Sequence, residues 1–414
     1  MFALADANNF YASCETVFRP DLRGKPICVV SNNDGCVIVR SAEAKRMGIK
    51  MGAPLFKNER YFRENGVHIF SSNYALYGDM SARMMSILGK MVPGQEIYSI
   101  DESFLDVSGI AAYMPLEEFG RQMRDRVKKE IGLTIGVGFG PSKTLAKLAN
   151  FAAKKWIRTN GIVDLSSPDR QRKLLALVSV DDVWGIGSRL SKRLHAMNIS
   201  TALQLTDSNT SIIRKSFDVI VERTVRELNG ESCLALKDAP PAKQQIVVSR
   251  SFGQRVTTID ELQQAVVTHA TRAAEKLHEQ SSKCRHITVS VATGRYGNEP
   301  HYANAAAMTC EYPTSDTRDI IDFALQALEL IWRDGYRYAK AGVTLGDFYQ
   351  SHVAQLDMFS QQLPRANADE LMSAVNQINR SGLGKVWFAG QGTDNAWQMK
   401  CEMLSPRYTT CFVK

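Results

Sequence analysis

Two adjacent carboxylates, Asp101 and Glu102, lie inside the stretch YSIDESF, residues 98–104. The segments on either side have the residue types of β-strands, so the pair occupies a turn between two strands. Neighbouring negative charges repel each other, and side chains arranged in this way commonly await a cation. On spacing alone, the competing interpretation is a solvated surface turn, which is the more frequent role of an Asp-Glu pair.

A third carboxylate, Asp6, stands at the end of the first predicted strand. The two-residue period of a strand places Phe2, Leu4 and Asp6 on one side. If this strand and those flanking the Asp101–Glu102 turn share one sheet, the three carboxylates come together. Mg²⁺ prefers such hard oxygen ligands and leaves positions open for water and substrate phosphates. The pattern therefore predicts a site for two Mg²⁺ ions and in-line phosphoryl transfer.

The elements that must position these residues are read from hydrophobic periodicity. Strand and helix patterns alternate up to about residue 165, which predicts a mixed α/β domain with a small inserted subdomain. Short helical segments follow from about residue 166. Pro240 and Pro241 indicate a linker, because two prolines cannot continue a helix and they stiffen an extended path. A second α/β unit comes next, and beyond about Gln350 the chain looks polar and irregular. The clearest helical patterns cover residues 74–90, 116–131, 261–279 and 317–334.

Length and composition limit the class of protein. The 414 residues exceed one ordinary core, and 44% hydrophobic with 23% charged residues is typical of a globular protein. The net charge of +8 suits a polyanionic partner, and Lys and Arg gather between residues 121 and 200. Eight cysteines without paired CxxC spacing argue against a zinc module and for reduced thiols. With neither a signal peptide nor a long apolar run, we expect a cytoplasmic protein without membrane insertion.

Four stretches, taken in order, resemble one known family: DANNFYASCE, YSIDESFLDVSG, GVGFGPSKTLAKLAN and LSPRYTT. This is the Y-family of lesion-bypass DNA polymerases, and within it the branch of the bacterial DNA polymerase V catalytic subunits, UmuC and its plasmid-borne relatives. The resemblance covers nearly the whole chain. It implies an α/β (α+β) right-hand polymerase with a palm at residues 1–21 and 73–165, fingers at 22–72, a helical thumb at 166–235, a linker at 236–245, an α/β little finger at 246–350 and a tail at 351–414.

The resemblance also implies roles at the catalytic centre. Asp6, Asp101 and Glu102 are the catalytic metal ligands, and the backbone carbonyl of Ala7 is a further ligand. With two Mg²⁺ ions and a nucleotide triphosphate present, the repulsion between the carboxylates is relieved. The metal ions then lower the cost of the charge that develops on the phosphates.

Four further residues are implied to bind the incoming nucleotide. Phe10 and Tyr11 face its sugar, and Tyr11 is the steric gate that excludes a ribose 2′-OH. Without the resemblance, both aromatic rings would be assigned to the core. Lys45 and Lys154 contact the triphosphate and would otherwise be ordinary solvated lysines. Many relatives carry Tyr and Arg where this chain has Ala42 and Lys45, and a lysine lacks the bidentate fork of arginine.

The remaining implied sites bind DNA and a clamp. Gly185 and Gly187 precede a basic helix with Arg189 and Lys192, which is typical of a helix-hairpin-helix whose amides bind a DNA phosphate. A Gly-x-Gly turn alone is common. Arg250 is a further candidate for contact with the DNA backbone. The pentapeptide QLDMF resembles a sliding-clamp binding motif; its residues are Gln355, Leu356, Met358 and Phe359.

The sequence thus predicts an error-prone, template-directed DNA polymerase that performs translesion synthesis in the SOS response, without proofreading. Its expected partners are primer-template DNA, dNTPs, the sliding clamp, a dimer of cleaved UmuD and a RecA filament. Two other classes stay open. A nucleotide cyclase shares the acidic sheet but needs neither a thumb nor the Tyr11 gate. A noncatalytic DNA-binding scaffold would carry a decayed site, whereas Asp6, Asp101 and Glu102 are intact.

Overall fold

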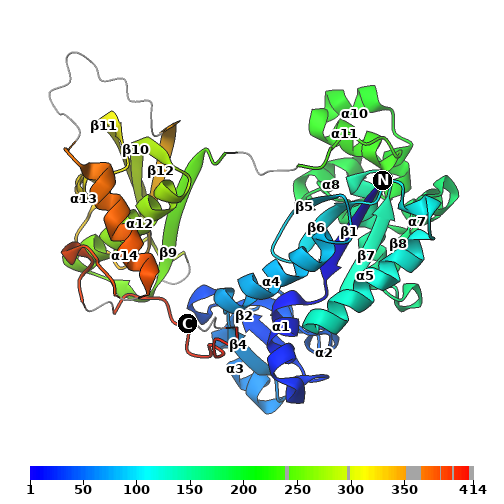
Figure 1. The fold of residues 1–414 in the computed structure, drawn as a ribbon, viewed down its shortest axis with the longest axis horizontal. Helices are drawn as coiled ribbons and strands as arrows, with labels where there is room; N and C mark the ends of the chain where they lie inside the picture. The colour runs from blue at the N-terminus through cyan, green and yellow to red at the C-terminus, as the bar shows by residue number, and fades with distance from the viewer. Residues whose placement is uncertain (238–241, 296–298, 351–364, 383, 394–395, 410–414) are drawn as a thin grey trace. The chain divides into compact units, whose positions relative to one another are not determined.

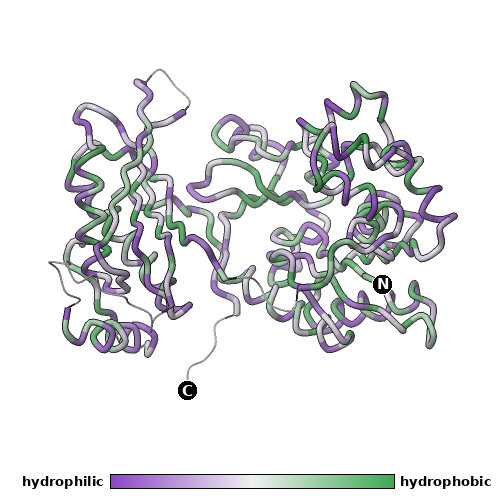
Figure 2. Tube along the Cα trace, turned by 90° about the horizontal axis from the view of Figure 1, so that it is seen from above, coloured by the Kyte–Doolittle hydropathy of each residue, from purple (hydrophilic) through white to green (hydrophobic). Residues whose placement is uncertain are grey.

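The computed structural model describes residues 1–237, 242–295, 299–350, 365–382, 384–393 and 396–409 (Figure 1). The chain forms two compact units. The first comprises residues 1–31, 35–240 and 403–414, and the second comprises residues 32–34 and 241–402. Figure 2 shows hydrophobic and hydrophilic residues interspersed along the helices and strands of both, as amphipathic elements require. Pro240 and Pro241 of the predicted linker lie outside the described residues.

A five-stranded sheet forms the centre of the first unit. Its order is β5 (Gly94–Ile97), β6 (Glu102–Asp106), β1 (Phe2–Ala7), β7 (Ile135–Gly140) and β8 (Ile162–Asp164), and only the β7–β8 pair is parallel. Strand β1 is buried along its whole length. On one face of the sheet, Phe2 and Leu4 pack with Phe104 of β6 and with Ala146 of helix α6 (Lys143–Lys155), as the two-residue period predicts. Ala3, Ala5 and Ala7 pack into the core on the other face.

Helices cover both faces of this sheet. Their bounds are α1 (Phe10–Phe18), α4 (Tyr74–Gly89), α5 (Leu116–Ile131) and α6 (Lys143–Lys155). Helix α6 lies unusually close to β7, because a Cβ at Gly138 would stand 2.1 Å from the backbone nitrogen of Asn150. A Cβ at Gly140 would likewise stand 2.7 Å from the backbone nitrogen of Ala146. The glycines of the GVGFG stretch therefore permit the helix–strand contact on which the site depends.

A small subdomain is inserted after α1. Its sheet has the order β3 (Val37–Arg40), β2 (Ile27–Val30) and β4 (His68–Ser71), with α2 (Ala42–Arg46) and α3 (Leu55–Glu64) alongside. Strands β2 and β3 pair antiparallel, and β2 and β4 pair parallel. The subdomain has its own apolar core around Cys28, Val37 and Phe62.

Residues 166–235 form short helices, as the sequence pattern predicts. They are α7 (Pro168–Leu177), α8 (Ser188–Ala196), α9 (Ala202–Thr206), α10 (Thr210–Ser216) and α11 (Val219–Leu228). Their apolar faces share one core with Leu145, Leu148 and Ala152 of α6. Helix α6 thus joins this helical part to the catalytic sheet.

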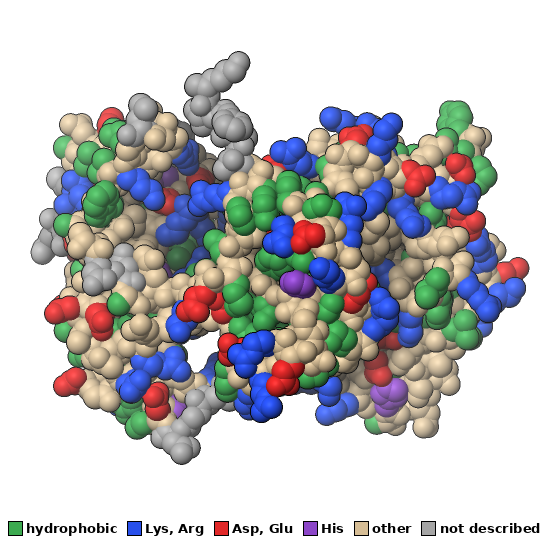
Figure 3. Space-filling model, turned by 90° about the horizontal axis from the view of Figure 1, so that it is seen from below, with side chains coloured by type: hydrophobic (Ala, Val, Ile, Leu, Met, Phe, Trp, Pro, Cys, Tyr) green, Lys and Arg blue, Asp and Glu red, His purple; other side chains and the backbone are tan. Residues whose placement is uncertain are grey.

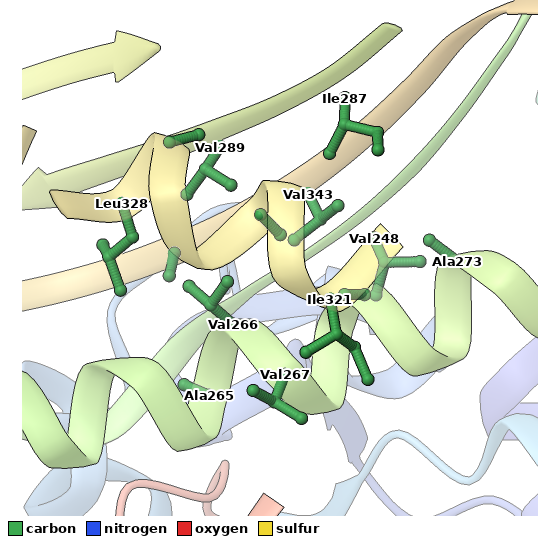
Figure 4. Close-up of a cluster of buried hydrophobic side chains, with 14 of the residues drawn as sticks. Val248, Ala265, Val266, Val267, Ala273, Ile287, Val289, Ile321, Leu328 and Val343 are labelled. Carbon is green, nitrogen blue, oxygen red and sulfur yellow. The ribbon is translucent and has the colours of Figure 1, made fainter. Parts of the chain in front are cut away.

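The second unit is a four-stranded antiparallel sheet with two long helices on it. The strand order is β11 (Ala303–Thr314), β10 (Ser282–Thr293), β12 (Tyr338–Gln350) and β9 (Gln245–Val256), and the helices are α12 (Ile259–Glu279) and α13 (Thr317–Ile331). Figure 4 shows part of the core between them, to which both layers contribute Val248, Val266, Ile287, Leu328 and Val343. Both helices match the predicted periodicity.

The expectation of an irregular chain beyond Gln350 was wrong in part. Residues Ala368–Ser381 form helix α14, whose Met372 is buried. Its apolar residues follow helical spacing, but its many polar side chains concealed the pattern. The predicted tail is also divided, since residues up to 402 belong to the second unit and those from Met403 to the first.

No helix of the described residues is both long and apolar enough to cross a membrane.

Buried His269 of α12 predicts a pH-dependent stability. It is 3% exposed, and burial together with the nearby charge of Arg250 lowers its pKa from 6.5 to about 4. The unfolded chain binds a proton below about 6.5, whereas the folded chain resists it until about 4, so acid favours unfolding. We expect urea titrations to show that His269→Gln removes roughly 2 kcal/mol of acid sensitivity between these pH values. Equal acid sensitivity in both proteins would contradict this.

Candidate active site

The three residues that carry the candidate carboxylates lie at one end of the β1–β6 pair. Asp6 is the register partner of Glu102 in the antiparallel ladder. The backbone nitrogen of Ala7 donates to the carbonyl of Asp101 at 2.9 Å. One sheet therefore brings together residues far apart in the sequence, as the strand pattern predicts.

Helix α6 presents two cations to these carboxylates. Lys154 forms an ion pair with Asp6, and Lys147 pairs with Glu102 at 3.0 Å. Between them Asn150 donates to the carbonyls of Leu4 (3.2 Å) and Gly136 (2.8 Å), which ties the helix to β1 and β7. Residues 147, 150 and 154 recur at helical spacing and share the sheet-facing side of α6. Charge is thereby balanced at the buried end of the sheet.

Lys147 is a site residue that the sequence reasoning missed. Its ammonium group lies 4.8 Å from the ring centre of Tyr98 and 5.6 Å from that of Trp184, so two aromatic faces hold it beside Glu102. The i, i+7 spacing of Lys147 and Lys154 on one helix was the available signal. To use this signal, one must know which face of the helix meets the sheet, and the sequence alone does not give that face.

The pKa values of Asp6 and Glu102 are shifted in opposite directions by their surroundings. Burial raises the pKa of Asp6, the charge of Lys154 opposes this, and the interaction with Glu102 adds to the rise, which gives a net pKa of about 7. Burial alone would raise the pKa of Glu102, but the hydrogen bond with Asp6 and the charges of Lys147 and Lys154 lower it. The two carboxylates therefore differ in how readily each takes up a proton, Asp6 more readily than Glu102.

The donor atoms suit a hard divalent cation, although they are not gathered into a finished metal site. Asp6 Oδ1 is buried and has no hydrogen-bond partner, so an acceptor is free beside Glu102. Asp101 Oδ1 accepts a hydrogen bond from the Ser99 hydroxyl at 2.6 Å. Among the described residues, no three Asp, Glu, His or Cys side chains form a cluster ready for a metal ion. Lysine ammonium groups neutralise the carboxylates in this conformation.

The two aromatic residues of α1 occupy different environments. Tyr11 is half-buried and stacks on Tyr77, with ring centres 4.3 Å apart and planes at 10°, while Tyr74 meets it edge-on. Burial, then the nearby Tyr74 and Asp101, raise the pKa of Tyr11. Phe10 is 3% exposed and packs in the core. Its packing in the core is what the structure shows, and its implied contact with the nucleotide sugar stays a prediction.

A cationic group lies beside the carboxylates on the small subdomain. Lys45 of α2 donates to Asn9 Oδ1 at 2.6 Å, and burial with the charges of Arg40 and Lys154 lowers its pKa. Lys45, Arg40 and Lys154 therefore lie close enough to repel one another. Arg40 was missed by the sequence reasoning; its position as the charged last residue of β3 was the signal. Its buried Nε has no partner among the described residues.

The candidate DNA-binding residues fall on both units. Gly185 has φ of 89°, a conformation that favours glycine, in the turn before α8, and Gly187 caps that helix. Arg189 and Lys192 are exposed on α8, and Arg250 is exposed on β9 of the second unit. Lys and Arg side chains are spread over the face shown in Figure 3. The clamp-motif residues 355–359 lie outside the described residues.

Comparisons with known proteins agree along the chain. Residues 5–150 match the impB/mucB/samB family, residues 243–358 match the C-terminal domain of that family, and residues 369–414 match a domain of unknown function. The chain is 58% identical to protein UmuC of Salmonella typhimurium, covering 99% of this chain and 98% of that protein. It is 55% identical to protein ImpB of the same organism, with 99% and 97% covered. DNA polymerase IV of Pelotomaculum thermopropionicum is 28% identical, with 86% and 87% covered.

Solved structures show the same architecture. A Y-family DNA polymerase chimera of Dbh and Dpo4 matches with a TM-score of 0.66 at 21% identity, covering 84% of this chain and all of that one. An insertion ternary complex of Dbh DNA polymerase matches with a TM-score of 0.56 at 19% identity and the same coverage. At these identities the likeness establishes the fold, which is that of a Y-family DNA polymerase.

The identity to the curated relatives establishes more than the fold. The chain belongs to the impB/mucB/samB family of UmuC-type Y-family polymerases. It is an error-prone translesion DNA polymerase, with a role in DNA repair and SOS mutagenesis, and it binds template DNA. Membership of this family implies dependence on a divalent metal ion. The polymerase prediction from the sequence is confirmed, and the cyclase and scaffold alternatives fall away.

Proposed function

We propose that the polymerase joins nucleotides at Asp6, Asp101 and Glu102 by a two-metal mechanism with Mg²⁺. The observation that carries this is the β1–β6 register, which sets Asp6 opposite Glu102 and ties Ala7 to Asp101. Three carboxylates and the Ala7 carbonyl are the hard oxygen donors that such ions take. When bound, two Mg²⁺ ions would stabilise the charge on the attacking and leaving oxygens.

The lysines around the carboxylates have a part in the same proposal. Lys154 neutralises Asp6 in this structure and is 34% exposed, so its ammonium group can exchange Asp6 for an incoming triphosphate. Lys45 and Arg40 lie beside it on the small subdomain. Together the three cations attract the triphosphate to the carboxylate end of the sheet. The half-buried ring of Tyr11 packs against the core and stacks on Tyr77, and we propose that it excludes a ribose 2′-OH.

Templated synthesis is tested by primer extension on undamaged and abasic templates. The full chain is supplied with Mg²⁺, dNTPs, the sliding clamp, a dimer of cleaved UmuD and a RecA filament, which we propose as its partners. The nucleotide added should follow the template base on undamaged DNA, and extension should continue past the abasic site. Extension that ignores the template would contradict the proposal.

We propose the cytoplasm as the location of the protein, because template DNA and dNTPs are found there.

We propose that Gln355, Leu356, Met358 and Phe359 bind the sliding clamp. Replacing Leu356, Met358 and Phe359 together by alanine should abolish the stimulation of primer extension by the clamp. Extension without the clamp should not change. Equal stimulation of both proteins would contradict this assignment.

DNA contact by the thumb predicts a salt effect. Arg189 and Lys192 are exposed on α8, directly after the Gly185–Gly187 turn. If each contacts one phosphate, replacing it by alanine should reduce the slope of log affinity against log salt by about one. Arg172 is the matched control, because Asp207 already neutralises it through a bidentate pair. Equal slopes for Arg172→Ala and Arg189→Ala would overturn the phosphate contact. Arg250→Ala gives the same test for the second unit.

A further inference from the structure

Residues 403–408, here called the C-terminal strap, pack on the first unit within the stretch that matches a domain of unknown function. The strap begins beside strand β4, where the backbone nitrogen of Ser71 donates to the Met403 carbonyl at 3.0 Å. Met403 in turn donates to the Ser71 hydroxyl at 3.0 Å. Near its other end the ring of Tyr408 stacks on Phe18 of α1, with centres 4.8 Å apart and planes at 4°. The strap thus contacts both the small subdomain and α1.

Ser405, at the middle of the strap, is buried against polar groups. Its hydroxyl donates to Glu15 Oε1 at 3.0 Å and accepts from Asn73 Nδ2 at 2.9 Å. The same amide also donates to the Ser405 carbonyl at 3.1 Å. Asn73 caps α4, so the strap is fixed to the start of that helix. Such a set of contacts orients one hydroxyl toward one carboxylate.

Glu15 depends on the hydroxyls around it. It is fully buried, and in the described part of the chain no Lys, Arg or His stands within ion-pair distance. Burial raises its pKa, while the hydrogen bonds from Tyr77 and Ser405 lower it. The Tyr77 hydroxyl donates to the same Oε1 atom at 2.8 Å. Removing either hydroxyl leaves a buried carboxyl group with half of these hydrogen bonds.

Tyr77 connects this buried group to the active site. Its ring is fully buried and forms the surface on which Tyr11 stacks at 4.3 Å. Tyr11 and Glu15 also stand one turn apart on α1, so both ends of the contact belong to the same helix face. Glu15, Tyr77 and Tyr11 thus form one continuous series of contacts.

We propose that the C-terminal strap is a positioning element for sugar discrimination: Ser405 holds Glu15, Glu15 holds Tyr77, and Tyr77 sets the ring of Tyr11. Ser405 is a positioning residue, since it acts through others and touches no substrate. The inference rests on the proposed role of Tyr11 as the steric gate. It gives the domain of unknown function a task in nucleotide selection.

The test is the ratio of ribonucleotide to deoxynucleotide insertion by the full chain, in the supplemented primer-extension reaction. Ser405→Ala should raise this ratio about three- to tenfold, the scale of one lost ordinary hydrogen bond. Tyr77→Phe keeps the stacking ring and removes the hydroxyl, so it should give a similar rise. In the double variant, the rise in the insertion ratio should be smaller than the product of the two single rises, because both changes interrupt the same series of contacts. A ratio measured on one preparation is independent of its folded fraction.

Ser72→Ala is the matched control. Ser72 is also a buried serine next to Asn73, but its hydroxyl donates to the Val30 carbonyl at 2.6 Å, away from Glu15. The ratio of ribonucleotide to deoxynucleotide insertion in Ser72→Ala should equal that of the wild type. Ser405→Thr keeps a hydroxyl and should restore most of the discrimination.

Tyr11→Ala in the same assay separates the two proposals. If it leaves the ratio unchanged, the gate assignment fails and the strap inference falls with it. If Tyr11→Ala raises the ratio while Ser405→Ala and Tyr77→Phe match Ser72→Ala, the gate stands and the strap inference is overturned. Equal losses of ribonucleotide and deoxynucleotide insertion in Ser405→Ala would also overturn it, since the strap would then serve stability alone.

Discussion

Replacing Asp101 by alanine is expected to lower the rate of templated extension by roughly a thousandfold, the scale of a lost electrostatic stabiliser of the reacting phosphate. Asp101 lies beside Ala7 and Asp6 at the end of the β1–β6 pair. Its side chain accepts only the short hydrogen bond from Ser99 among the contacts described for it, so alanine should leave the fold intact. Rates of single-nucleotide addition, with DNA affinity measured in parallel, check this.

The matched control for this variant is Asp106→Ala. Asp106 ends strand β6, which begins directly after Asp101, and pairs with Phe2 at the other end of the ladder; its side chain accepts a hydrogen bond from the backbone nitrogen of Ser108. We expect it to extend primers within a few-fold of wild type. Equal losses in both variants would mean that the strand, and not the carboxylate at position 101, had been disturbed.

Replacing Tyr11 by alanine is expected to raise ribonucleotide insertion roughly a hundredfold relative to deoxynucleotide insertion. The proposed reason is steric: the half-buried ring, which stacks on Tyr77, would occupy the space that a ribose 2′-OH needs. Deoxynucleotide insertion should fall much less, since the cations and carboxylates remain. Competitive insertion of one ribonucleotide and its deoxy counterpart gives the ratio directly.

Tyr11→Phe distinguishes the ring from its hydroxyl. Phenylalanine keeps the stack on Tyr77, so discrimination should stay close to that of the wild type. If Tyr11→Phe were as permissive as Tyr11→Ala, the hydroxyl would carry the selection and the steric account would be wrong.

Local patterns were sufficient to predict the centre of the site. The two-residue period of β1 placed Phe2, Leu4 and Asp6 on one face, and the structure confirms that Phe2 and Leu4 pack with Phe104. The strand types around Asp101 and Glu102 predicted a turn at a sheet end. Both inferences depend only on neighbours in sequence, and for that reason they were accessible.

Contacts between distant segments were not accessible in this way. Lys147 was missed because its pairing with Glu102 depends on how closely α6 approaches the sheet, which Gly138 and Gly140 decide. The bond of Ser405 to Glu15 joins residues 390 positions apart. No periodicity encodes such a pairing. The burial of Phe10 in the core also depends on distant segments, and its contact with the nucleotide, implied by resemblance, stays a prediction.

Mn²⁺ binding followed by electron paramagnetic resonance is the most direct measurement of the two-metal site. The full chain would be titrated with primer-template DNA and a non-hydrolysable dNTP present, in the wild type, in Asp101→Ala and in Asp106→Ala. The account predicts about two bound Mn²⁺ ions in the wild type and in Asp106→Ala, with clear loss in Asp101→Ala. Undiminished binding in Asp101→Ala would contradict it.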